Sequence, residues 1–261
     1  MKHLTMLGFA LLLTSFAFAQ DPADLYLTFE FMRVDESQQN AYWETETFWS
    51  AIHQQRANAG QIIGWDLWSL EPSGSDQDYQ YMTVTLYKSF KDMIAGDPNF
   101  MANAKAAYPK MTDDEFSKKM TATSASRDLA MRVYLHQIDA TSDQFSMPIG
   151  TMATIDFMQE LDDDYTEYES EIFKPMHQAM VDSGKKGSWG LEEVLFPAGS
   201  DRYCSHITVN MYKDADQFAS GGMGMGGDMS EAASLGIEKA LESRDMKKVL
   251  MATLVKKVRA N

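Results

Sequence analysis

The chain has 261 residues and a formal net charge of −15 at pH 7, with 38 acidic against 23 basic side chains. A surface this acidic repels nucleic acid and anionic lipid, so neither is expected as a partner. Cys204 is the only cysteine, which excludes an intramolecular disulfide.

Residues 1–19 have the pattern of an export signal. Lys2 and His3 precede an apolar run from Leu7 to Phe18, and Ala-Phe-Ala at 17–19 matches the small-x-small cleavage pattern. The run is too short to span a bilayer as a permanent helix. We therefore expect a soluble mature chain that begins at Gln20, is periplasmic or secreted, and leaves the membrane after cleavage.

The first half of the mature chain alternates strand and helix patterns. Residues 26–34 alternate apolar and polar side chains and predict a half-buried strand, and helical spacing follows over 38–59. Gly60 is placed to end that helix in a left-handed cap. Strands are predicted over 62–70 and 79–88, on either side of a turn at 72–76. A broken helical region, with a capping box at Thr112 and Glu115, leads to a strand over 127–138.

The same order then repeats over 151–158, 162–183, 188–195, 203–213, a broken helical region, and 247–258. Residues 140–150 lack periodicity and are expected to link a first unit (20–139) to a second (151–261). Ser126-Arg127-Asp128 also matches Ser243-Arg244-Asp245. The clearest pairs are Trp49 with Phe173, His53 with His177, Gln54 with Gln178, Gly60 with Gly184 and Trp65 with Trp189.

The element order β-α-β-β-α-β is that of the ferredoxin-like unit. Two such units, each with His-Gln late in its first helix and a following G-x-x-x-x-W, resemble the dimeric α+β-barrel superfamily, including uncharacterised exported bacterial proteins. The resemblance implies an α+β fold in which two four-stranded sheets face each other with the helices outside. Because one chain carries both units, we expect an intramolecular barrel and a monomer. The superfamily includes cofactor-free monooxygenases, haem-degrading enzymes, lactone isomerases and ligand-binding proteins, so it implies no single reaction.

The first candidate site is aromatic and lies on the helix side of the sheet. Aromatic rings bury a large apolar area and favour flat ligands by stacking, and pockets of similar folds lie between helices and sheet. The alternative is that its histidines only donate to backbone carbonyls at a helix end. The residues are Trp49, His53 and Trp65 in the first unit and Phe173, His177 and Trp189 in the second.

The second candidate site is the polar face of the central strands. We expect the apolar face, with Leu27 and Phe29, to pack under the helices and the polar face to line the barrel lumen. Enclosure there would raise the carboxyl pKa values and suit these groups to proton transfer, although a self-satisfied polar barrel is the alternative. Because this assignment puts the helix with His53 on the opposite face of the sheet from Glu30, we do not expect these two residues to form a pair. The residues are Glu30 and Tyr87 in the first unit and Asp156, His206 and Tyr212 in the second.

Two weaker patterns are set aside. Cys204 and His206 could form a nucleophile pair, but no oxyanion-hole signal accompanies them. Residues 221–229 carry methionine thioethers that could hold Cu(I), yet a mobile glycine loop is the favoured interpretation, and we predict no metal site.

The expected function is binding of a small apolar or aromatic molecule without a fixed cofactor. One alternative is a cofactor-independent monooxygenase or isomerase that uses His53/His177 or Glu30/Asp156 for proton transfer. Another is a protein-interaction module whose contact surface includes the turns at Pro72 and Pro197. Whether the chain is an enzyme stays open. The two units are expected to differ, because Glu192 replaces Trp68 and Phe173 replaces Trp49.

Overall fold

The computed structural model describes residues 24–72, 74, 77–221 and 231–261. The predicted export signal lies outside the described residues, as does nearly all of the glycine- and methionine-rich segment 221–229, for which no metal site was predicted. No helix among the described residues has the length and apolar character needed to cross a membrane.

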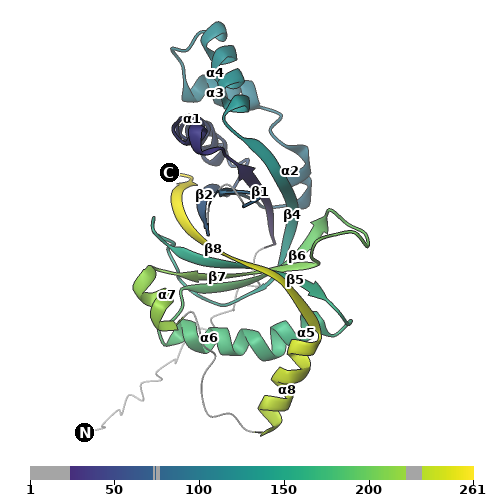
Figure 1. The fold of residues 1–261 in the computed structure, drawn as a ribbon. Helices are drawn as coiled ribbons and strands as arrows, with labels where there is room; N and C mark the ends of the chain where they lie inside the picture. Colours follow the sequence, from purple (N-terminus) through teal and green to yellow (C-terminus); the bar gives the residue numbers. More distant parts are fainter. Residues whose placement is uncertain (1–23, 73, 75–76, 222–230) are drawn as a thin grey trace, which may run out of the picture.

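Each half of the chain runs strand, helix, two strands, helices and strand (Figure 1). The first half comprises β1 (Leu25–Arg33), α1 (Gln39–Asn58), β2 (Gly64–Glu71), β3 (Tyr81–Tyr87), α2 (Phe90–Ala95), α3 (Phe100–Ala107), α4 (Asp113–Ala125) and β4 (Asp128–Ala140). The second comprises β5 (Met152–Glu160), α5 (Tyr165–Tyr168), a π-helical turn (Glu169–Phe173), α6 (Lys174–Asp182), β6 (Ser188–Phe196), β7 (His206–Tyr212), α7 (Ala215–Gly221), α8 (Glu231–Glu242) and β8 (Arg244–Arg259).

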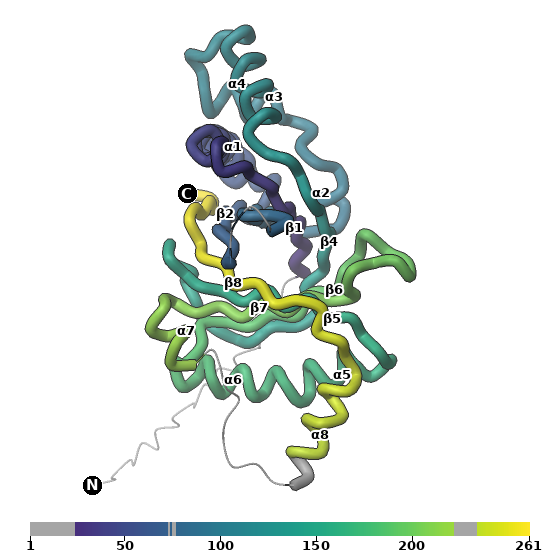
Figure 2. The backbone as a smooth tube through the Cα atoms, in the orientation of Figure 1, coloured from purple at the N-terminus to yellow at the C-terminus, as the bar shows by residue number. Residues whose placement is uncertain are grey.

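The strands form one closed antiparallel barrel in the order β1-β3-β2-β8-β5-β7-β6-β4. Within each half the order is the same: β4-β1-β3-β2 and β8-β5-β7-β6. The halves join where β2 pairs with β8 and where β4 pairs with β6. In the tube view the long strands β4 and β8 run from one half towards the other (Figure 2). The expected barrel therefore forms within a single chain.

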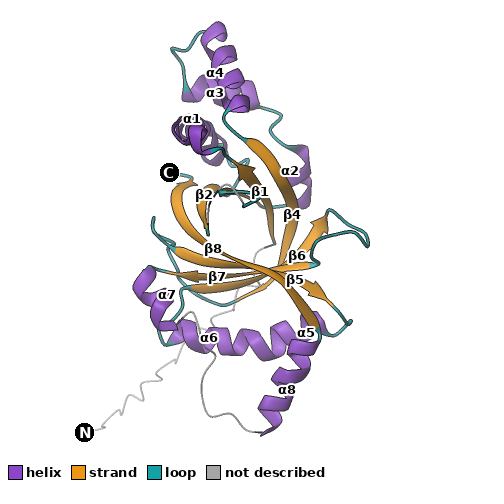
Figure 3. Ribbon diagram, viewed as in Figure 1, coloured by secondary structure: helices purple, strands orange, loops and turns teal. Residues whose placement is uncertain are grey.

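The helices lie outside the barrel, in two groups (Figure 3). In the first half α1 and α2 contact the strands and α3 and α4 pack against α1, and α5 to α8 lie on the second half. Gly60 (φ +70°) and Gly184 (φ +72°) each follow the first helix of their half in the left-handed conformation, as the glycine pattern predicts. The predicted capping box is also confirmed, because Thr112 Oγ1 accepts from Glu115 N at 3.2 Å and Glu115 Oε2 accepts from Thr112 N at 2.8 Å.

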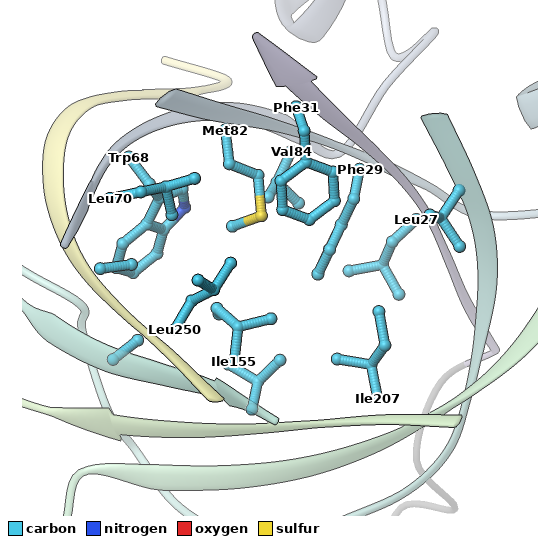
Figure 4. Packing of buried hydrophobic residues seen from close by; sticks show 14 of the residues in the cluster. Leu27, Phe29, Phe31, Trp68, Leu70, Met82, Val84, Ile155, Ile207 and Leu250 are labelled. Carbon is cyan, nitrogen blue, oxygen red and sulfur yellow. The ribbon is translucent and has the colours of Figure 1, made fainter. Parts of the chain in front are cut away.

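The barrel interior is apolar, which corrects the predicted assignment of the strand faces. Leu27, Phe29 and Phe31 point into the barrel and meet Ile155 and Ile207 from the opposite half (Figure 4). An eight-stranded barrel is only wide enough to be filled by side chains, and a polar group sealed there without a partner costs about 1–3 kcal/mol. The apolar faces therefore fill the barrel, and the polar faces lie outside, beneath the helices.

Candidate functional site

A cavity of about 380 Å³ lies on the outside of the second half, between the sheet and the segment that contains α6. Strands β5 to β8 form its floor, and the π-helical turn, α6 and α7 form its walls. Its polar and aromatic lining comprises Thr154, Asp156, Glu169, Phe173, His177, Lys186, Trp189, Thr208, Asn210, Tyr212 and Arg244. Its apolar lining comprises Met158, Met180, Phe218, Met246 and Val249.

This cavity brings together residues from both candidate sites. Phe173, His177 and Trp189 come from the helix-side set, and Asp156 and Tyr212 come from the set assigned to the lumen. The two sets meet because the polar strand face lies under the helices, so the expected separation on opposite faces was wrong.

His206 is not part of the cavity lining. Its Nδ1 lies 3.0 Å from Ser205 Oγ, and its ring is tilted against Tyr165 at 4.8 Å. Burial, and secondly the charge of Arg202, lower the pKa of His206 to about 4. Cys204 packs instead with the core cluster of the barrel, and burial raises the pKa of its thiol to about 11. A Cys204–His206 nucleophile therefore has no structural support.

Asp156 on β5 supplies the acid of the cavity. Its Oδ2 accepts from Asn210 Nδ2 at 2.8 Å and from Thr208 Oγ1 at 3.3 Å. Its Oδ1 is buried and has no hydrogen-bond partner among the described residues. Burial raises the pKa of Asp156, although hydrogen bonds and the charge of Lys186 oppose that shift. A buried acceptor in this state favours a ligand that donates a hydrogen bond to it.

Lys186 lies beside the acid and follows the glycine that ends α6. Its Nζ lies 2.6 Å from Asn210 Oδ1 and 2.8 Å from His177 Nδ1. Burial lowers the pKa of Lys186 to about 8, against the opposing effect of Asp156. Burial, followed by the charge of Lys186, lowers the pKa of His177 to about 3. His177 is thus a neutral imidazole, with its ring stacked on Trp189 at 5.1 Å.

A buried Tyr–Glu–Arg group borders the cavity. Arg244 Nη1 donates to Glu169 Oε1, and its guanidinium lies 4.3 Å from the centre of the Phe173 ring. Burial raises the pKa of Glu169 in spite of Arg244, and burial also raises the pKa of Tyr165. The charges of Arg244 and Glu169 therefore pair with each other, and the group shapes one wall of the cavity.

The same group occurs in the first half as Tyr42, Glu46 and Arg127, with Arg127 Nη1 2.9 Å from Glu46 Oε1. Of these residues, the sequence pairs only Arg127 with Arg244, through the repeated Ser-Arg-Asp, and none of them was predicted as a site residue. The signal was present: Tyr-x-x-x-Glu occurs at the matching place in both first helices, and the arginines occupy the repeated Ser-Arg-Asp.

The second copy differs from the first by one residue in the helix. Glu46 precedes Trp49 by three residues, whereas Glu169 precedes the corresponding Phe173 by four. The π-helical turn Glu169–Phe173 accommodates the additional residue. Such single-turn π insertions are frequent at functional sites. Here the turn supplies two lining residues of the cavity.

The first-half aromatic candidates form a stack, of which Trp49 also lines a hollow of about 310 Å³. The His53 ring lies between Trp49, at 5.9 Å, and Trp65, at 5.0 Å, and its Nδ1 is 3.1 Å from Arg56 Nη1. Burial, and then the charge of Arg56, hold the pKa of His53 well below its usual value. Tyr87 is likewise buried, in the apolar cluster that contains Trp65.

The first-half acid is already paired. Glu30 accepts from Arg132 Nε at 2.8 Å and Nη2 at 2.5 Å, beside a hollow of about 310 Å³ that Arg132 helps to line. In the sheet register Glu30 lies opposite Arg132, whereas Asp156 lies opposite Val249. The arginine that pairs with the first acid is therefore replaced by an apolar side chain beside the second.

The halves also differ inside the barrel. Trp68 packs in the core cluster, and Glu192, its counterpart, is buried with its Oε1 3.2 Å from Gln137 Nε2. Neither residue lines the cavity. The Trp68-to-Glu192 exchange therefore does not explain why the outer pockets differ.

The comparisons with known proteins concern the fold. No family model and no curated protein matches the chain. Similar solved structures include a candidate monooxygenase from Fusobacterium nucleatum (TM-score 0.55, 12% identity, 91% of this chain and 94% of that chain). An anthrone oxidase-like protein also resembles it (TM-score 0.52, 11% identity, 93% of this chain and 95% of that chain). A haem-binding protein from Thermus thermophilus does so as well (TM-score 0.52, 9% identity, 89% of this chain and 92% of that chain). At these identities the likeness shows the fold alone, and this chain shares the fold of these solved structures.

Proposed function

We propose that the second half of the barrel binds a small, flat, largely apolar molecule that donates one hydrogen bond to Asp156. The observation that carries this proposal is the buried Asp156 Oδ1, which has no partner among the described residues and borders the cavity. A donor placed there would satisfy an acceptor whose isolation otherwise costs about 1–3 kcal/mol.

The size and lining of the cavity support a small, largely apolar ligand. Arg244 pairs with Glu169, so these two side chains offer no unpaired charge to a ligand. The apolar walls come from methionine, phenylalanine and valine side chains, which adapt to a flat ring. A volume of about 380 Å³ falls in the range of small-molecule sites.

The test uses 2-naphthol, which has a flat ring and one donor, and 2-methoxynaphthalene, which lacks the donor. Calorimetric titration should show tighter binding of 2-naphthol, and Asp156→Ala should remove the difference, which we expect to be about tenfold or more. Glu30→Ala is the matched control, because its carboxylate is already paired with Arg132. Equal affinity for both ligands, or equal effects of the two variants, would contradict the proposal.

A second candidate function is proton transfer from a bound carbon acid to Asp156. Its support is the raised pKa of Asp156 together with the accessible place of this group at the cavity, which suit a general base. The names of the monooxygenase and anthrone oxidase-like neighbours are compatible with such chemistry. Deuterium exchange into anthrone, followed by NMR, should be accelerated by the native chain and not by Asp156→Ala. Equal exchange rates would exclude this candidate.

Haem does not fit the cavity, although one structural neighbour is named as haem-binding. His177 is the histidine of the cavity lining, and its Nδ1 lies 2.8 Å from Lys186 Nζ. With Lys186 as the donor of this hydrogen bond, the neutral imidazole carries its hydrogen on Nε2, and that nitrogen then has no lone pair for iron. Among the described residues there is also no cluster of three or more His, Cys, Asp or Glu suited to a metal ion. The proposed function therefore uses neither haem nor a metal ion.

We also propose that the chain consists of two ferredoxin-like units that close the barrel as a monomer, and that it is exported. The identical strand order of the halves and their pairing through β2–β8 and β4–β6 support the first part. The pattern of residues 1–19 supports the second. Light scattering on the purified chain tests the monomer, and N-terminal sequencing of the protein from its host tests cleavage before Gln20.

A further inference from the structure

Lys186 is a buried lysine without an ion pair among the described residues. It is 4% exposed, and the salt bridges of the described part of the chain do not include it. Buried lysines are ordinarily paired, because an isolated ammonium is costly away from water. The neighbours of this Nζ are instead two neutral acceptors, Asn210 Oδ1 and His177 Nδ1.

With the His177 hydrogen on Nε2, these two neighbours can accept the two hydrogens of an uncharged amine. A protonated lysine has three N–H donors, so one of them would lack a partner among the described residues. An uncharged Nζ satisfies both acceptors and keeps its lone pair free. Lys186 also lines the cavity, where a ligand can reach it.

We propose that Lys186 forms an imine with an aldehyde or ketone bound in the second-half cavity. This inference rests on the proposed function, because it assigns a reactive carbonyl class to the same small-molecule site. Lysines that form Schiff bases lie in such desolvated places, where the amine is available as a nucleophile.

The chemistry balances without an oxidant or reductant. The Nζ lone pair adds to the carbonyl carbon, and the carbon–oxygen double bond opens. One proton then leaves Nζ and one is taken up by the oxygen, which gives a neutral carbinolamine. A second proton on that hydroxyl lets it leave as water, and Nζ loses its remaining proton as the carbon–nitrogen double bond forms. Asp156, joined to Lys186 through the Asn210 amide, is the acid placed to exchange these protons.

The pKa of Lys186, lowered to about 8 by burial, supports the assignment. At pH 8 about half of such an amine is uncharged, which is about a hundredfold more than for an ordinary lysine. The adjacent Lys185 is exposed and provides an internal comparison on the same segment.

The experiment treats the full chain with benzaldehyde and sodium cyanoborohydride at pH 8, which fixes an imine as a stable secondary amine. Peptide mapping by mass spectrometry should find Lys186 labelled on the order of tenfold faster than Lys185. Lys186→Arg should abolish that label, and Lys185→Arg should leave it intact. An excess of 2-naphthol should slow labelling of Lys186 and not of Lys185.

Labelling confined to Lys185, to other exposed lysines or to the N-terminal amine would overturn the proposal. That result is separable from failure of the proposed function, which the 2-naphthol titration measures independently. Normal 2-naphthol binding without label at Lys186 rejects the imine and keeps the binding site. Absent 2-naphthol binding rejects the proposed function itself.

Discussion

Val249 in β8 occupies the position beside Asp156 that Arg132 in β4 occupies beside Glu30. In the first half the guanidinium pairs with the carboxylate at 2.5–2.8 Å, and in the second the valine cannot. One exchange in a duplicated site thus leaves one acid paired and the other available. This difference is the reason why we propose the ligand site in the second half.

Arg132→Val should uncover a second, weaker site beside Glu30. The variant removes the group that holds the carboxylate, and a hollow of about 310 Å³ already lies there. Titration with 2-naphthol should then show an additional binding event. Arg202→Val, which removes an arginine from a different ion pair, is the control. An unchanged stoichiometry in Arg132→Val would mean that the arginine does not close the site.

Arg244→Met should strongly destabilise the fold. Glu169 is 1% exposed, and removal of its partner would leave a buried carboxylate without compensation, which costs about 3–5 kcal/mol. Arg202→Met, in the more exposed pair with Glu160, should cost about 0–1 kcal/mol. Urea unfolding monitored by circular dichroism compares the two, and similar losses would contradict the assignment of Glu169 and Arg244 as a buried pair.

Glu192→Gln should increase stability at alkaline pH. Burial raises the pKa of Glu192 to about 8, so the folded state favours the protonated acid. Its contribution is fully present below the unfolded pKa of about 4.3 and is lost as pH rises through about 8, by on the order of 5 kcal/mol in total. The free energy of unfolding of the native chain should therefore fall between pH 5 and pH 9 by more than that of Glu192→Gln. Glu193→Gln, at the exposed neighbouring position, should behave like the native chain.

Much of the fold could be predicted from the sequence because its signals are local. Alternation in residues 26–34 and the left-handed glycine at Gly60 depend only on neighbouring residues, and both agree with the structure. Neighbouring residues do not decide which face of a strand points into the barrel. The alternation separates Phe29 from Glu30 but does not say which side becomes the interior. Closure of the barrel decides that, because it seals one face away from water.

The candidate site could be predicted only in part for the same reason. His177, Trp189 and Asp156 were identified singly, but the wrong face assignment kept the acid apart from the histidine. Lys186 was missed because the aligned position in the first unit is Ile62, so the repeat gave no signal there. Arg132 was one of several possible partners that the sequence left open for Glu30 and Asp156. Only the strand register shows that it lies opposite Glu30, which makes the first-half acid the paired one.

The most direct test of the central claim is calorimetric titration of 2-naphthol into the native chain and into Val249→Arg. The variant places beside Asp156 the side chain that pairs with Glu30 in the first half, and its fold can be checked by circular dichroism. We predict one bound molecule per native chain and loss of binding in the folded variant. Unchanged binding by Val249→Arg, or two equal sites in the native chain, would contradict the account.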